Sequence, residues 1–260
     1  MCRPNWAALA AAPVPRLADL AACLAPHLDA DRYDHEGDPA GVWIASDRPV
    51  RRLGLRLDAG RAPYGWLPVG PEEGVDALLV HRPFGLWPAR LPAGLGVLAV
   101  HRALDDRFAA GHNPALAHAL GLALETEPLL RGGSVVGMIG QTGDDYAGVE
   151  SRLGAAFGGH DATAGEAPPG PVGRVAVVGA MTEALVADAA ERGATVYVTG
   201  ELRKPAEAAV RRTGLRVVAV GQGRSERWGL RHLGGLLAAA WPGLAVVDLD
   251  GPAGTGGEAM

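Results

Sequence analysis

Several side chains that can bind metals or carry protons come directly after apolar segments of this chain. His81 follows the apolar segment 76–80, and His101 follows the segment 96–100, with Asp105 four residues later. Imidazole and carboxylate groups are the usual protein ligands of divalent transition metals, and both can act as acids or bases. These residues therefore predict either a metal site or an acid–base site.

The second half of the chain carries a similar arrangement. Its middle apolar segments are followed by Glu201 in one case and by Gln222, Ser225 and Glu226 in the other. Each residue also has a plainer interpretation, because loop histidines are commonly hydrogen-bonded and a Ser–Glu pair suits the first turn of a helix. The joint pattern, more than any single residue, indicates a functional site.

Apolar runs that alternate with helical patterns predict the elements that position these groups. In the second half, strands are expected at 174–179, 195–199, 216–220 and 244–249, with helices at 182–193, 205–212 and 225–241. This alternation indicates βαβ units and an α/β fold with mainly parallel sheets covered by helices. Ligands of such sheets bind beyond the carboxyl ends of the strands, where the histidines and carboxylates lie.

The first half repeats the pattern more loosely. Helices are expected at 16–28, 115–122 and 145–157, and strands at 41–46, 52–58, 76–80, 96–100 and 135–139. Asn113 before Pro114 is a plausible helix cap, and the stretch 158–173, rich in glycine and proline, reads as a linker or long loop. We therefore expect a first lobe over 1–130, a connecting segment over 131–172 and a second lobe over 173–260.

Composition excludes several classes of protein. The 260 residues are 48% hydrophobic and 20% charged, enough apolar material for a sizeable core and too much for a disordered chain. A net charge of −5 argues against a nucleic-acid partner, because no basic excess would neutralise phosphates. The two cysteines exclude a disulfide framework, and no apolar stretch is long enough to cross a membrane, so we expect a cytoplasmic protein. The tryptophans show no repeat spacing, which favours core or interface positions.

Four motifs, taken in order, resemble those of one family. LLVHRPFGLW has the form of a strand ending in His-His-Pro, with His81 at the first histidine and Arg82 at the second. AVHRALDDRF has the form of a His-Thr-Asn-x-Asp segment and keeps His101 and Asp105, with Arg102 in place of threonine. YVTGELRKP matches a Thr-Gly-Asp/Glu segment. VGQGRSERWGL matches Gly-His-x-x-Ser-Glu, except that glutamine replaces histidine. Over roughly residues 40–250 the chain resembles the Nif-three-like (NGG-interacting-factor-three-like) family, whose members are often named GTP cyclohydrolase 1 type 2 homologues.

The resemblance implies two interlocked α/β lobes, a two-metal site in a cleft between them, and assembly into hexameric rings. When the metal ligands of the family are matched to this sequence motif by motif, the resemblance implies His81, Asp105 and Glu226 as ligands, with Gln222 as a weak ligand. A metal of the zinc, iron or manganese class is then expected as one ion or none, instead of two.

Two departures from the motifs put the second ion in doubt. Arg82 cannot offer a lone pair to a metal, and Gln222 offers only a neutral carbonyl oxygen. One hypothesis is that Arg82 and Arg102 pair with the remaining acids and replace the ions, leaving a subsite for a small anion. The alternative is that both arginines face solvent and one metal remains on His81, Asp105 and Glu226.

Three classes of function follow. The chain could be a non-catalytic binding or scaffold protein in a ring of identical subunits, holding a small anionic or nucleotide-like ligand. It could be a metal-dependent hydrolase of such a small substrate, with His101 or Glu201 as proton carrier. The resemblance could also be accidental, in which case the chain is an unrelated α/β protein.

Overall fold

A computed structural model describes residues 14–35, 38, 40–58, 74–86, 89, 91–125 and 127–250. The chain divides into two compact units, one formed by residues 1–104 with 229–260 and the other by 105–228. The boundaries expected near residues 130 and 172 both fall within the second unit. The expected cleft between lobes stays a prediction.

The first unit contains a sheet in the strand order β1-β4-β3-β2-β12. Its elements are α2 (Leu17–Leu28), α3 (Ala30–His35), β1 (Gly41–Ile44), β2 (Arg52–Asp58), β3 (Ala77–Arg82), β4 (Gly96–Ala99), the start of α4 (His101–Arg107), the later part of α9 (Gln222–Ala240) and β12 (Ala245–Asp248). The strands β4, β3, β2 and β12 run parallel to one another, and β1 pairs antiparallel with β4. This sheet is mainly parallel, as expected.

Helices cover the first sheet through apolar faces. In α2, buried leucines recur at helical spacing at positions 17, 20, 24 and 28, so one face of the helix is apolar. Each fully buried leucine contributes about 1.5–3 kcal/mol relative to an exposed one. Helix α9 approaches the sheet closely at Gly234, where a Cβ atom would lie 2.9 Å from Cγ1 of Val246 and 3.0 Å from Cδ1 of Leu55. The lack of a side chain at this position lets the helix backbone pack against β2 and β12.

The second unit is built around a mixed sheet in the order β5-β7-β9-β10-β11-β8, with β6 paired to β7. Its elements are α5 (Pro114–Ala119), β5 (Ala123–Leu124), β6 (Leu129–Arg131), β7 (Ser134–Asp145), α6 (Tyr146–Phe157), β8 (Ala162–Ala164), β9 (Pro171–Val178), α7 (Glu183–Glu191), β10 (Val196–Thr199), a 3-10 turn (Lys204–Ala206), α8 (Glu207–Thr213) and β11 (Arg216–Ala219). Only β9, β10 and β11 run parallel among the described strands of this sheet.

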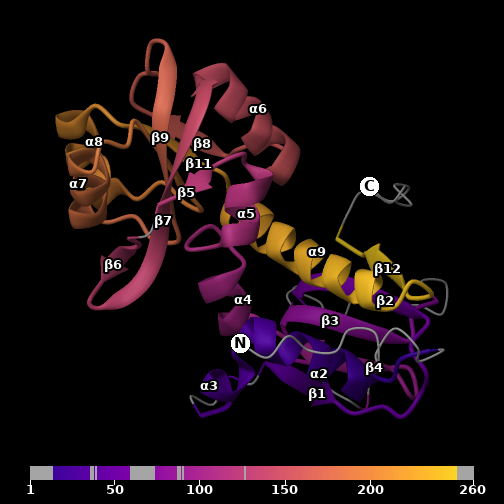
Figure 1. Cartoon of the computed structure of the whole chain (residues 1–260). Helices are drawn as coiled ribbons and strands as arrows, with labels where there is room; N and C mark the ends of the chain where they lie inside the picture. The colour runs from indigo at the N-terminus through magenta and orange to yellow at the C-terminus, as the bar shows by residue number, and fades with distance from the viewer. Residues whose placement is uncertain are drawn as a thin grey trace. The chain divides into compact units, whose positions relative to one another are not determined.

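Apolar side chains of the central strands fill both faces of the second sheet. In β9, Val175 and Val177 belong to a core shared with α5 and α6, while Ala176 and Val178 belong to a core shared with α7 and α8. Figure 1 shows α6 on one side of this sheet and α7 and α8 on the other. The α/β fold with two sheets covered by helices is confirmed.

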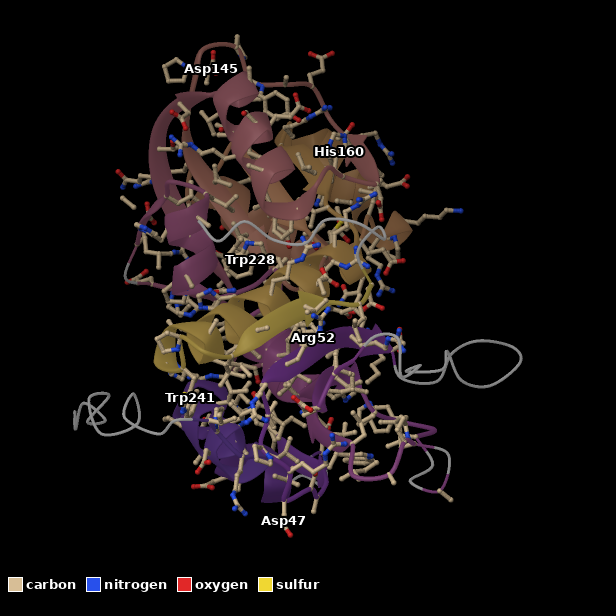
Figure 2. All side chains as sticks on the ribbon, turned by 90° about the vertical axis from the view of Figure 1, so that its right-hand side faces the viewer. Asp47, Arg52, Asp145, His160, Trp228 and Trp241 are labelled. Carbon is tan, nitrogen blue, oxygen red and sulfur yellow. The ribbon has the colours of Figure 1, made fainter. Side chains whose placement is uncertain are left out.

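Most expected elements are present, and the predicted cap of α5 is found. The side chain of Asn113 accepts a hydrogen bond from the backbone N–H of Leu116, which confirms it as the cap of α5. Asp145, labelled in Figure 2, caps α6 by accepting from the N–H of Gly148. The stretch expected as a linker or long loop, 158–173, is not a continuous linker, because β8 and the start of β9 lie within it and both are hydrogen-bonded into the sheet.

Among the described residues, no helix has both the length and the apolar character needed to span a membrane.

A histidine on α9 makes the stability of the first unit depend on pH. Burial lowers the pKa of His232 from its ordinary value of 6.5, and the nearby His27 lowers it further by charge repulsion. The unfolded chain therefore binds more protons than the folded chain just below pH 6.5, so acidification through this range favours unfolding. We expect the melting temperature of the wild-type protein to fall from pH 7 to pH 5.

Differential scanning calorimetry across this pH range tests the prediction. The His232→Gln variant, which does not titrate, should show a smaller fall than the wild type. His118→Gln on the exposed face of α5 serves as the control and should keep the wild-type slope. An equal fall in wild type and His232→Gln would contradict the prediction.

Candidate functional site

Two histidines lie side by side at the carboxyl edge of the first sheet. His81 is the next-to-last residue of β3, and His101 begins α4 with one residue between it and the end of β4. Because β3 and β4 are parallel neighbours with Val80 opposite Ala99, both histidines leave the sheet at the same edge. Their ring centroids lie 5.3 Å apart, and His81 is 0% exposed.

Helix α4 adds a carboxylate to these rings. The division between the two units falls inside this helix, after Leu104, so the geometry of the helix itself fixes Asp105 relative to His101. Residues four apart lie on the same helix face, one turn from each other. His81, His101 and Asp105 each offer a ligand atom, and these atoms all lie within 4.8 Å of one another.

Asp38 orients the imidazole of His101. Its Oδ2 atom lies 2.7 Å from Nδ1 of His101, and both side chains are largely buried. A carboxylate can only accept a hydrogen bond, so Nδ1 carries the proton and the lone pair of Nε2 faces away from Asp38. Histidine ligands of metals commonly donate their second ring N–H to a carboxylate in this way.

Asp38 is a site residue that the sequence motifs do not indicate. It precedes β1 by three residues and lies 63 positions before its partner, and no motif links it to a histidine. The one available signal was a carboxylate just before a strand expected in the same sheet as His101.

The donor set fits one divalent transition-metal ion. Two imidazoles and one carboxylate are ligand types found together around zinc, iron and manganese. Three protein ligands leave coordination positions open, which is typical of catalytic sites and not of structural ones. Among the described residues, this group does not include Glu226 or Gln222.

The start of α9 places its polar residues in the second unit. The buried Glu226 accepts a hydrogen bond from Nε2 of Gln222 over 3.0 Å, one helical turn away. The amide oxygen of Gln222 lies against Gly200, where a Cβ atom would be only 2.5 Å from it. Ser225 is buried and accepts a hydrogen bond from the backbone N–H of Ala110 over 2.6 Å. These contacts give Ser225 a structural partner and fix Gln222 beside Glu226.

A pocket of about 250 Å³ opens in the second unit next to these residues. Its polar lining comes from Asp105, Asp106, Arg131, Gln222 and Ser225, and its remaining walls are formed by residues 109–111, 135–136 and 179–180. The hydroxyl of Tyr197 donates to the carbonyl of Ala180 over 2.6 Å and so holds one wall in place. Burial raises the pKa of Tyr197, which keeps this hydroxyl protonated. The pocket can accept a small polar molecule, and its side chains of both charges suit a ligand with several hydrogen-bonding groups.

The remaining expected site residues are found near the surface. Arg82 forms an ion pair with Asp58, its neighbour across the β2–β3 ladder, with 3.3 Å between Nη1 and Oδ2. Arg102 is exposed on α4. The side chain of Glu201 is 61% exposed and pairs with Arg203 over 2.9 Å. The anion-binding role of the arginines and the catalytic role of Glu201 stay predictions.

Proteins with similar sequences share one name. A protein from Allochromatium vinosum named GTP cyclohydrolase 1 type 2 homolog is 28% identical over 247 residues, covering 87% of this chain and 93% of the relative. A protein of the same name from Yersinia pestis is 25% identical over 232 residues, covering 83% and 91%.

Solved structures share the fold. The protein ybgI, described as of unknown function, has a TM-score of 0.68 at 22% identity and covers 92% of this chain and 99% of its own. Reduced HcgD from Methanocaldococcus jannaschii has a TM-score of 0.66 at 21% identity, with 91% and 98% covered. A Bacillus cereus protein related to NIF3 has a TM-score of 0.60 at 16% identity, with 93% and 98% covered.

The family model described as DUF34/NIF3 (NGG1p interacting factor 3) matches residues 15–250, which cover most of both units and contain all four motifs. The resemblance inferred from the four motifs is thereby confirmed, and the chain belongs to the DUF34/NIF3 family.

Proposed function

We propose that this protein is a metal-dependent hydrolase of a small, nucleotide-like substrate, with one divalent ion held by His81, His101 and Asp105. The observation that carries the proposal is the convergence of these three ligand atoms within 4.8 Å, next to a carboxylate that orients one of the imidazoles. The names of the curated relatives support a nucleotide-like substrate. A divalent ion bound there would supply Lewis acidity toward a carbonyl or phosphoryl oxygen.

The protein's own residues have distinct roles in this proposal. Asp38 keeps His101 in the tautomer that presents Nε2, and the burial of His81 keeps competing water away from that ligand. Asp105 belongs to the ligand group and also lines the pocket of the second unit. Arg82 and Arg102 are proposed to bind an anionic part of the substrate, Arg82 while remaining paired with Asp58.

A non-catalytic binding role is the second candidate. Two metal-ligand positions of the family motifs are altered, and in the structure these two side chains have other partners. Arg82 is paired with Asp58, and Gln222 donates to Glu226. Such a protein would bind the same class of ligand without turning it over. We also propose that the protein is cytoplasmic and forms a homo-oligomer. The family resemblance implies that this assembly is a hexameric ring.

The metal content of the protein tests the proposed site. Protein purified without chelator and reloaded with zinc should hold one ion per chain by elemental analysis. Asp105→Asn should lower zinc affinity by more than the roughly 10- to 100-fold typical of losing a supporting residue, because it removes a charged ligand. Asp106→Asn, one residue along the same helix and exposed, is the matched control and should bind zinc like the wild type.

Two results would contradict the one-ion site. Two tightly held ions per chain would restore the two-metal arrangement that the motifs imply. Equal zinc affinity of wild type and Asp105→Asn would remove Asp105 from the ligand set. A zinc-loaded protein that binds nucleotides but hydrolyses none of a panel of them would favour the non-catalytic role.

The role of Asp38 has its own test. Asp38→Asn keeps the size of the side chain but removes the charge that favours the Nδ1–H tautomer and stabilises the imidazole as a ligand. We expect zinc affinity to fall about tenfold, measured by competition with a chelating dye, and Asp38→Ala to lose more, up to about 100-fold. Asp106→Asn, the exposed control used above, should leave zinc affinity unchanged. An unchanged affinity in Asp38→Ala would rule out the supporting role.

A further inference from the structure

A run of four aromatic rings leads from the buried ligand group to the surface of the first unit. It begins at His81, continues to His101 at 5.3 Å between centroids, then to Phe84 at 4.9 Å, and ends at Trp43 at 6.4 Å. His81 is 0% exposed, whereas the two outer rings are both exposed, Phe84 at 55% and Trp43 at 38%. The outer two rings therefore present aromatic surface to solvent beside the candidate metal ligands.

Phe84 is presented by a tight turn. The backbone N–H of Leu86 donates to the carbonyl of Pro83 over 3.0 Å, and Gly85 has a φ of +89°, which glycine adopts without strain. Pro83 and Gly85 thus close a turn directly after β3, with Phe84 at its corner. The ring meets His101 edge to face, with an interplanar angle of 88°.

Trp43 is presented by an irregularity in the strand β1. Val42 pairs with Leu98 and Ile44 pairs with the adjacent Val97, so Trp43 is an extra residue in the ladder. Bulges of this kind change the direction of a side chain and are frequent beside functional sites. As a result Val42 and Trp43 are both exposed, which strict alternation along a half-buried strand would not give. The indole meets Phe84 edge to face at 85°.

We propose that Trp43 and Phe84 form a stacking surface for a planar aromatic or heteroaromatic ring of the substrate, and so determine specificity. This inference rests on the proposed function, because it places the ring of the substrate beside the ligands that act on the rest of it. A large exposed aromatic surface is costly in water, and stacking with a flat ring removes it from water while satisfying the preferred ring geometry. A nucleobase suits this surface, because every base has a flat face that can stack on an aromatic side chain. Such stacking does not depend on which hydrogen-bonding groups lie at the edge of the base.

Isothermal titration calorimetry of the full-length, zinc-loaded protein tests the stacking surface with inosine, uridine and ribose as probes. Both nucleosides should bind, inosine more tightly because its ring system is larger, and ribose alone should not. Trp43→Leu and Phe84→Leu should each weaken inosine binding about five- to tenfold, while Trp43→Phe should stay within about twofold of the wild type. Val42→Ala, the exposed neighbour on the same strand, is the matched control and should bind inosine like the wild type.

Zinc content measured on the same samples separates this inference from the proposed function. If the protein binds no zinc but binds inosine, and Trp43→Leu weakens that binding, the proposed function is wrong and the stacking surface is supported. Bound zinc with equal inosine affinity in wild type, Trp43→Leu and Phe84→Leu would overturn the stacking surface alone, as would failure of every probe to bind. Light scattering measures the size of the assembly and tests whether the two rings are an interface between copies of the chain. If the leucine variants change the size of the assembly but not inosine binding, the two rings are an interface between copies and the inference is wrong.

Discussion

Parallel pairing of β3 with β4 is the constraint on which the candidate site depends. It brings the ends of two strands, nearly twenty residues apart in the chain, to one edge of the sheet, with His81 and His101 as the residues that emerge there. The helix that follows β4 without an intervening loop then carries Asp105 onto the same side as His101. No flexible segment separates these ligands from the sheet, so their spacing is set by backbone hydrogen bonds. Sites of this kind need little reorganisation when they bind an ion.

Asp38 and Arg82 show how the surroundings of such a group are adjusted by charge. The carboxylate of Asp38 faces the ring nitrogen that a metal would not use, and its negative charge makes that imidazole a better donor to a cation. On the other side of His81, the arginine of the altered motif is paired with Asp58 at the end of the adjacent strand. That pairing balances part of its charge at the sheet edge and limits its repulsion of a nearby cation. An arginine at this position is therefore compatible with the His–His–Asp group.

Much of the fold could be predicted because its strongest signals are local. Buried runs such as 174–179 and the cap Asn113 depend on neighbouring residues, and both appear where expected. The direction of pairing is not local, and the sequence pattern could not show that β7 and β8 run antiparallel to their neighbours. His81, His101 and Asp105 were identified as chemical groups from their positions after strands. Periodicity does not encode contacts between distant segments, and the participation of His101 in the ligand group and its support from Asp38 depend on such contacts. Nor does it encode the one-residue bulge that exposes Trp43.

The strand β12 has a consequence for how the chain is made. It is the final strand of the first sheet, it pairs with β2, and it lies almost two hundred residues after that partner, with the whole second unit inserted before it. During synthesis the ribosome must therefore complete the inserted unit before the first can close, and until then β2 presents an unpaired edge to other chains. Nascent or truncated polypeptides that end before residue 245 therefore lack the strand that covers the edge of β2.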